Sequence, residues 1–225
     1  MEVWEPEEKG RFRLSHRVTV NQPWVVFGRS RRCDVPLSQP TISARHAYVQ
    51  AWSGRALCYD LDSRSGTQRD VLLPSSGSGP GAAELAIGRY GARILAHSTG
   101  HSTGEPTPGI AREPSSFWLE FFNRTPAGAP AQEEQPQIYR PTRAVTLIGR
   151  SPACRIQLQS RSISRIHCSL VQTASGVWIV DLLSRTGVRV NGRLVEFARL
   201  NDGDHLQIGR FEMNCLTESS GEGSM

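Results

Sequence analysis

The sequence predicts an all-β protein with two β-sandwich domains joined by a flexible linker, and three observations lead to this prediction. Short runs rich in Val, Ile, Leu and aromatic residues alternate with Gly, Ser, Asn and Asp turns, and no segment keeps a 3.6-residue apolar period over several turns. A set of short motifs occurs twice at one spacing. The chain of 225 residues also has room for two domains of roughly 100 residues, each with its own core.

The expected strands follow the apolar runs. In the first half they cover residues 17–20, 24–27, 47–51, 56–61 and 93–95. In the second half they cover residues 117–122, 145–148, 168–172, 177–181, 188–190 and 211–216. The continuous apolar run Val177–Val180 indicates a strand that is covered on both faces.

Composition sets the expected domain boundaries. We expect a first domain over residues 1–96, a flexible linker over 97–116, a second domain over 117–218 and a disordered tail over 219–225. The linker segment holds a tandem His-Ser-Thr-Gly followed by Glu-Pro-Thr-Pro-Gly and has no apolar pattern to bury. The tail is rich in Gly and Ser.

The repeated motifs keep their register along the whole chain. Their numbers differ by 121 in each pair (28 and 149, 46 and 167, 66 and 187). This spacing is too long for one unit of a solenoid, so it indicates duplication of a domain. The pairs are Gly28–Ser30 with Gly149–Ser151, Ser43–His46 with Ser164–His167, and Asp60–Gly66 with Asp181–Gly187.

Charge favours acidic partners. The formal net charge is +5 and the sequence pI is about 9.3, which suits nucleic acid or phosphorylated protein. Lys9 is the one lysine among 26 basic residues. Selection for planar, bidentate phosphate recognition and a biased coding composition both explain this preference for arginine.

The remaining composition points to an intracellular protein. No apolar run approaches the roughly 18 residues of a membrane span, and the N-terminus is acidic, unlike a secretion signal. The five cysteines are an odd number without C-x-x-C spacing, which indicates neither a disulfide framework nor a zinc site. Cys33 and Cys154 are equivalent in the repeat, and we expect a small apolar role for both.

The preserved residue types suit the binding of an anion. An arginine after a glycine at a strand end offers a fork of donors, a serine adds a hydroxyl, and Ser/Thr-Gly turns expose backbone N–H groups. Loops at one end of a sandwich commonly carry binding residues. We expect no catalytic residue, cofactor or metal, because there is no Gly-x-Ser-x-Gly elbow and no acidic group placed to orient a histidine.

Taken together, the repeated motifs resemble those of the forkhead-associated (FHA) family. That family has a β-sandwich of the SMAD/FHA type and binds phosphothreonine peptides. The first copy matches through Phe27–Arg29 and Ser43–His46 and lacks the later Asn-Gly. The second copy matches more fully, through Ile148–Arg150, Ser164–His167, Asp181–Ser184, Asn191–Gly192 and Asp202–Asp204.

The resemblance implies roles for residues of the second copy. Arg150, Ser164 and Arg165 would hold the phosphate, and the turn that contains Ser184, Arg185 and Thr186 would contact the peptide. Thr186 stands where the family usually has asparagine. Val188 replaces the usual threonine, which we expect to remove a hydroxyl near the phosphate.

The first copy is expected to bind more weakly. Arg29 and Ser43 remain, but Ala44 replaces the second arginine. Removing one charge-assisted hydrogen bond costs about 1.5–3 kcal/mol. The peptide contacts implied for this copy are Ser63, Arg64 and Ser65, and the residues expected to support the loops of both copies are Gly28, His46, Gly149, His167 and Asn191. We expect the two glycines to be needed because the backbone adopts a particular conformation at each turn.

Three functions follow from these features. The first is a non-catalytic phosphothreonine-peptide reader or scaffold that recruits phosphorylated proteins in signalling, cell-cycle control or a chromosome-associated assembly. The second is a structural assembly module that no longer reads phosphate, and the third is direct binding of nucleic acid. Thr107 and Thr125, each followed by proline, are candidate phosphoacceptors for self-association. The arginine-rich composition favours the nucleus over the cytoplasm.

Overall fold

A computed structural model describes residues 1–6, 12–52, 55–67, 82–95, 117–122 and 137–217. The chain divides into two compact units, Met1–Thr107 and Pro108–Met225. Every regular element in the described ranges is a β-strand, which confirms the all-β prediction. The expected linker and tail lie outside the described residues.

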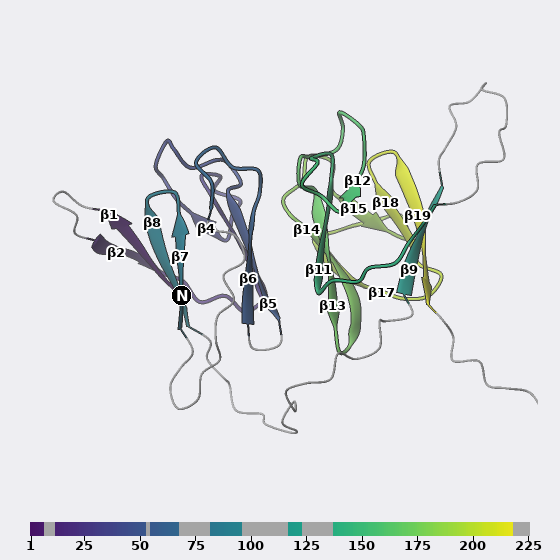
Figure 1. The fold of residues 1–225 in the computed structure, drawn as a ribbon, viewed down its shortest axis with the longest axis horizontal. Coiled ribbons are helices and arrows are strands. Elements are labelled where there is room, and N and C mark those ends of the chain that lie inside the picture. The colour runs from purple at the N-terminus through teal and green to yellow at the C-terminus, as the bar shows by residue number, and fades with distance from the viewer. Residues whose placement is uncertain (7–11, 53–54, 68–81, 96–116, 123–136, 218–225) are drawn as a thin grey trace, which may run out of the picture. The chain divides into compact units, whose positions relative to one another are not determined.

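The first unit is a sandwich of two four-stranded sheets (Figure 1). One sheet has the order β2-β1-β8-β7 and the other has the order β4-β3-β5-β6. The strands are β1 (Glu2–Pro6), β2 (Phe12–Arg17), β3 (Trp24–Gly28), β4 (Val35–Pro36), β5 (Ala47–Trp52), β6 (Arg55–Asp60), β7 (Ala82–Ile87) and β8 (Tyr90–Leu95). Buried residues of both sheets, such as Phe27, Val49, Ile87 and Tyr90, form one core between them.

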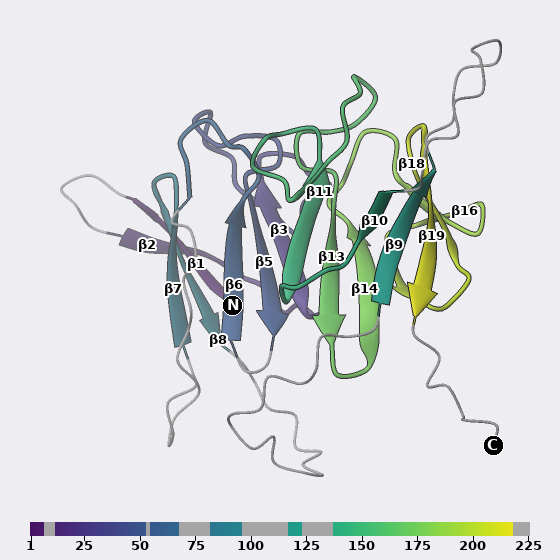
Figure 2. The same ribbon diagram turned by 45° about the vertical axis from the view of Figure 1, so that its right-hand side comes forward.

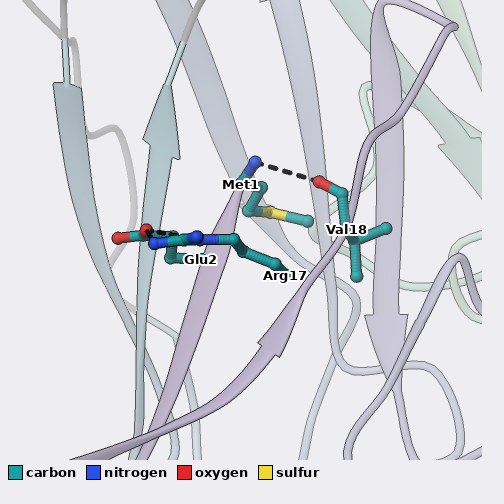
Figure 3. A network of polar contacts seen from close by, with 4 residues as sticks. All are labelled: Met1, Glu2, Arg17 and Val18. Carbon is teal, nitrogen blue, oxygen red and sulfur yellow. Dashed lines mark hydrogen bonds and ion pairs between the residues drawn. The ribbon is translucent and has the colours of Figure 1, made fainter.

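A network of polar contacts joins the start of β1 to the end of β2 (Figure 3). The amino group of Met1 donates to the carbonyl oxygen of Val18 at 2.9 Å, and the Val18 amide donates to the carbonyl of Met1 at 3.0 Å. The guanidinium of Arg17 forms an ion pair with Glu2 at 2.8 Å. The prediction of a strand at 17–20 is wrong, because β2 ends at Arg17 and residues 18–20 belong to no strand.

The second unit is a larger sandwich of the same kind (Figure 2). A six-stranded sheet has the order β10-β9-β19-β18-β15-β16 and a five-stranded sheet has the order β12-β11-β13-β14-β17. Buried residues of both sheets, such as Ile148, Leu170, Ile208 and Met213, form its core. The strands are β9 (Phe117–Phe122), β10 (Gln137–Tyr139), β11 (Val145–Gly149), β12 (Ile156–Gln157), β13 (Cys168–Thr173), β14 (Gly176–Asp181), β15 (Val188–Val190), β16 (Arg193–Val195), β17 (Phe197–Leu200), β18 (His205–Ile208) and β19 (Phe211–Thr217).

Equivalent strand pairs position the repeated motifs. In the first unit β3 pairs in parallel with the short β4 and antiparallel with β5, and in the second unit β11 pairs in the same way with β12 and β13. The loops that carry the arginine and the Ser-x-x-His motif therefore leave one end of one sheet. The third motif follows β6 or β14, the next strand of that sheet.

The described residues show neither a membrane-spanning helix nor a metal-binding cluster. None of these residues belongs to a helix long and apolar enough to span a membrane. Within the same ranges, no group of three or more His, Cys, Asp or Glu side chains could hold a metal ion.

Candidate functional site

Backbone hydrogen bonds join the first two loops of the second unit. The amide of Arg150 donates to the carbonyl oxygen of Ser164 at 3.0 Å, and the amide of Ser151 donates to the carbonyl oxygen of Arg165 at 2.9 Å. The two loops therefore run side by side, and the side chains of Arg150 and Arg165 are both exposed. The first unit repeats this pair of bonds at 2.8 and 3.0 Å, with Ala44 at the position of Arg165.

The glycine before each arginine is required by the close approach of these loops. A Cβ atom on Gly149 would lie 2.2 Å from the carbonyl oxygen of Arg165, and one on Gly28 would lie 2.4 Å from that of Ala44. Neither glycine has a φ in the left-handed region. The prediction that these glycines provide a special backbone conformation is therefore wrong, because the reason is steric: only a residue without Cβ fits against the neighbouring loop.

A buried histidine links the second loop to the third. Nδ1 of His167 accepts a hydrogen bond from the Ser164 amide at 3.1 Å, and Nε2 lies 3.1 Å from the carbonyl oxygen of Gly187. This pair of partners requires a neutral imidazole with its proton on Nε2. His167 is 0% exposed, and His46 makes the equivalent bonds in the first unit at 3.2 and 2.9 Å.

The serine of the Ser-x-x-His motif has a free donor. Oγ of Ser164 accepts a hydrogen bond from the Arg185 amide at 3.0 Å. A hydroxyl has one O–H in addition to its lone pairs, and within the described part of the chain no acceptor for this O–H is found. The accepted bond orients the hydroxyl, so its hydrogen is available to a ligand. Ser43 accepts from the amide of Arg64 at 2.9 Å in the same way.

The arginine side chains differ between the units. Within the described ranges, the guanidinium groups of Arg150 and Arg185 have no hydrogen-bond acceptor or acidic partner. In the first unit, Nε of Arg29 donates to the carbonyl oxygen of Ile42 at 3.2 Å, which leaves its terminal nitrogens for a ligand. Arg45 occupies the position of Ile166 rather than that of Arg165, and it is half-buried.

The third loop is a tight turn whose serine faces inward. In the second unit the Ser184 amide donates to Asp181 at 3.1 Å, and Oγ of Ser184 accepts from the Gly187 amide at 3.0 Å. Ser184 is 6% exposed, whereas Arg185 and Thr186 are on the surface. The geometry therefore gives Ser184 a part in shaping the turn and leaves Arg185 and Thr186 as the side chains that a peptide would meet.

The third loop of the first unit follows the same plan. Oγ of Ser63 donates to Oδ1 of Asp60 at 2.5 Å, so this hydroxyl is also used inside the turn. Arg64 and Ser65 are exposed, and Oγ of Ser65 donates to the carbonyl oxygen of Thr41 at 3.2 Å. Of the three residues expected to contact a peptide here, the two serines use their hydroxyls in bonds within the loops, and Arg64 has an exposed side chain.

Two positions with expected roles lie apart from the three loops. Asn191, in the turn between β15 and β16, donates to Asp204 at 2.7 Å and accepts from the His205 amide at 2.8 Å, so it braces a different turn. Val188 is 0% exposed and belongs to the core. In the first unit, Oγ1 of Thr67 at the equivalent position is buried. The side chain at this position faces inward, and the expectation that Val188 removes a hydroxyl near the phosphate stays a prediction.

A thiol supports the site in each unit, which the sequence reasoning missed. Sγ of Cys154 donates to the carbonyl oxygen of Arg165 at 3.4 Å, and Sγ of Cys33 donates to that of Ala44 at 3.2 Å. Burial raises the pKa of the Cys33 thiol from 9.0 to about 11, so this thiol keeps its proton at neutral pH. The recurrence of a cysteine at equivalent positions of the two copies is the sequence feature that could have indicated this supporting role.

The arrangement of the loops suits the binding of an anion better than nucleophilic catalysis. Both ring nitrogens of His167 are engaged with backbone groups, so the imidazole is not placed to take a proton from Ser164. What the loops present outward is a set of donors: exposed guanidinium groups and an oriented hydroxyl. Such a set complements an anion with several acceptor oxygens. Thr107 and Thr125 lie outside the described residues.

Comparison with known proteins gives the family. The FHA domain model matches residues 25–72 and 146–209, one match in each unit. The transcriptional regulatory protein EmbR of Mycobacterium tuberculosis is 42% identical over 66 residues, which cover 29% of this chain and 17% of EmbR. The glycogen accumulation regulator GarA of Mycolicibacterium smegmatis is 33% identical over 110 residues, which cover 48% of this chain and 65% of GarA. The chain thus spans less than two thirds of either relative.

Solved structures of FHA domains are also similar to parts of the chain. Mycobacterium tuberculosis EmbR in complex with a low-affinity phosphopeptide has 28% identity and a TM-score of 0.41, covering 48% of this chain and 26% of that one. The FHA domain of a Chlamydia trachomatis protein has 23% identity and a TM-score of 0.40, covering 47% of this chain and 100% of that one. The family matches fall on the two sandwiches that carry the equivalent loop sites, and the chain therefore belongs to the forkhead-associated family, with two FHA domains in tandem.

Proposed function

We propose that the chain is a non-catalytic phosphothreonine-peptide reader whose second FHA domain holds the phosphate of a partner protein through Arg150, Ser164 and Arg165. The observation that carries this proposal is the hydroxyl of Ser164, which the Arg185 amide orients at 3.0 Å and whose hydrogen has no acceptor in the described part of the chain. A phosphate oxygen supplies that acceptor. The flanking guanidinium groups then add charge-assisted hydrogen bonds.

The peptide backbone would lie across the third loop. Arg185 and Thr186 are the exposed residues of this turn, and the amide of Arg185 is already bound to Ser164. A peptide that contacts the turn therefore also affects the position of Ser164, which holds its phosphate. This connection is a physical reason for the site to require both the phosphate and the chain that carries it.

The first FHA domain has the same frame with fewer phosphate contacts. Its serine is oriented by Arg64 at 2.9 Å, but Ala44 offers no guanidinium. We infer a weaker phosphopeptide site in this domain. Two linked sites would raise the affinity for a doubly phosphorylated partner, to the extent that the linker lets both engage.

The test is a phosphothreonine peptide-library pull-down with the full chain. Wild type, Arg29→Ala and Arg150→Ala are compared, and Arg143→Ala is the matched control because this exposed arginine precedes β11, at the end of the strand away from Gly149. We expect Arg150→Ala to lose most of the captured peptides, Arg29→Ala to lose a smaller set, and the control to lose none. Equal capture of phosphorylated and plain peptides would favour an assembly module that does not read phosphate.

Self-association is a further partner possibility for the same site. Thr107 and Thr125 precede prolines and would become ligands for Arg150 of another copy when phosphorylated. Phosphorylated chain should then form dimers that Arg150→Ala dissolves, as measured by light scattering, and Thr107→Ala with Thr125→Ala should prevent them. The nuclear location that the composition favours is tested by none of these observations and stays a prediction.

A further inference from the structure

The loop between β3 and β4 has the same backbone hydrogen bonds as its counterpart between β11 and β12, but its charged residues lie at different positions. In each loop the serine after the phosphate-site arginine accepts, through Oγ, a hydrogen bond from the amide two residues on, at 3.2 Å in the first domain and 3.3 Å in the second. The following cysteine amide also bonds to the carbonyl of this serine, at 3.1 and 3.0 Å. Arg31–Arg32 therefore stand in the same places as Pro152–Ala153.

These two arginines extend the charge of the first site. Both are exposed, and within the described residues neither guanidinium has a hydrogen-bond acceptor or an acidic partner. Only Ser30 separates them from Arg29, and the loop is joined to the Ser43 loop by the bond from the Arg29 amide to the Ser43 carbonyl at 2.8 Å. An exposed arginine is ordinarily just solvated. Three exposed arginines in one loop, beside a site for an anion, place positive charge close to the position of its ligand.

The exposed arginines are distributed differently in the two domains. The first domain lacks the guanidinium of Arg165, where it has Ala44, and carries Arg31 and Arg32 in the loop before it. The second domain keeps Arg165 and has two other exposed arginines, Arg155 where the first domain has Asp34 and Arg161 where it has Pro40. The two positions after Ser30 are therefore charged in the first domain, whereas the equivalent positions after Ser151 are not.

We propose that the first FHA domain selects phosphothreonine peptides that carry a further anionic group beside the phosphothreonine, and that Arg31 and Arg32 bind this group. The proposal rests on the proposed function, because it assumes that this domain reads phosphothreonine. The group is a carboxylate or a second phosphate, since both match the fork of an arginine. With Ala44 in place of an arginine, the phosphate alone is held by fewer contacts, so the flanking anion contributes a larger share of the affinity.

The test uses the full chain with Arg150→Ala, which leaves the first domain as the phosphopeptide site. Peptide arrays with a fixed phosphothreonine carry neutral flanks, one glutamate at each flanking position in turn, or a second phosphothreonine at each position. The measured quantity is the ratio of affinities for anionic and neutral flanks. Two exposed charge pairs correspond to about a 2- to 30-fold ratio, which Arg31→Ala with Arg32→Ala should bring close to one.

Two further variants sharpen this result. Arg31→Lys with Arg32→Lys keeps the charge and removes the fork, so it should retain part of the ratio. In the chain with Arg29→Ala, which leaves the second domain as the site, Pro152→Arg with Ala153→Arg should create a preference for anionic flanks at the positions that the first domain prefers. The two loops share their backbone hydrogen bonds, so the second domain should accept these arginines without a change in its thermal unfolding.

The outcomes separate the two proposals. If phosphopeptides still bind but neither exchange changes the ratio, the assignment of Arg31 and Arg32 is wrong and phosphothreonine reading stands. If neither domain distinguishes phosphorylated from plain peptides, the proposed function fails as well. A plain DNA duplex is a separate arm: loss of duplex binding on Arg31→Ala with Arg32→Ala, with no change in the ratio, would overturn the proposal and make the loop a nucleic-acid surface.

Discussion

An exchange of residues between positions 44 and 165 should move phosphopeptide affinity between the two domains. The carbonyl oxygen of Arg165 accepts from the Ser151 amide at 2.9 Å and from the Cys154 thiol at 3.4 Å. The carbonyl oxygen of Ala44 has the same two kinds of partner, at 3.0 and 3.2 Å. Both side chains are exposed. The backbone is therefore held alike in the two domains, and a side chain placed at either position starts from the same place.

The magnitude follows from the single contact that is exchanged. A hydrogen bond to a charged group contributes about 1.5–3 kcal/mol, which corresponds to about a 10- to 150-fold change in affinity. Arg165→Ala should weaken the second domain by this factor. Ala44→Arg should strengthen the first domain by up to the same factor. Because both residues are exposed, neither change should alter the free energy of unfolding by more than about 0.5 kcal/mol.

The assay is fluorescence anisotropy with a labelled phosphothreonine peptide from the library and with its unphosphorylated form. Arg29→Ala isolates the second domain and Arg150→Ala isolates the first, both in the full chain. If Arg165→Ala leaves the affinity of the second domain unchanged, this guanidinium does not contact the phosphate. If Ala44→Arg strengthens binding of both forms of the peptide equally, the gain is general attraction by charge, and the phosphate-specific reasoning is refuted.

Three further changes test the frame of the site. Gly149→Ala places a Cβ 2.2 Å from the carbonyl oxygen of Arg165, so it should lower the free energy of unfolding by about 1–3 kcal/mol in urea denaturation, and an unchanged midpoint would contradict the close approach. His167→Phe leaves the Ser164 amide and the Gly187 carbonyl without their partner, at a cost of about 1–3 kcal/mol for each buried group; full stability by the same measurement would show that another group replaces the imidazole. Folding raises the pKa of the Cys33 thiol from 9.0 to about 11, so the contribution of this thiol to stability should be complete below pH 9 and be lost as pH rises through about 11. In urea titrations, Cys33→Ala should remove this part of the loss of stability at alkaline pH. An equal loss in the wild type and the variant would contradict this prediction.

The apolar runs predicted the strands best where aromatic or β-branched residues are dense. The expected strand at 117–122 coincides with β9 and the one at 188–190 with β15. In contrast, β7 (Ala82–Ile87) was not expected, because alanine has little preference for a strand. This strand forms through its ladder with β8, which pairs Ala82 with Leu95 and Ile87 with Tyr90. Pairing with a neighbouring strand is not visible in the composition of the strand itself.

The repeat located the site, but its internal contacts needed the fold. The 121-residue offset already brought together the arginine, serine and histidine of each copy. The steric role of Gly149 and the thiol bond of Cys154 depend on how closely two loops approach, which follows from the register of β11 against β13. The inward direction of Val188 depends on its pairing with Ile208 in another sheet. Sequence motifs specify which residues recur, whereas these relations depend on where the strands place them.

The central claim is that the second domain holds a phosphothreonine with the loops around Ser164. The most direct test is a titration of the isotope-labelled full chain with a phosphothreonine peptide from the library, followed through backbone amide shifts. We expect the largest changes at Arg150, Ser164–Arg165 and Arg185–Gly187, with the Arg185 amide among them because it donates to Oγ of Ser164. The unphosphorylated peptide should produce no such changes. Equal changes with both peptides, or changes confined to the turn around Asn191, would contradict the account.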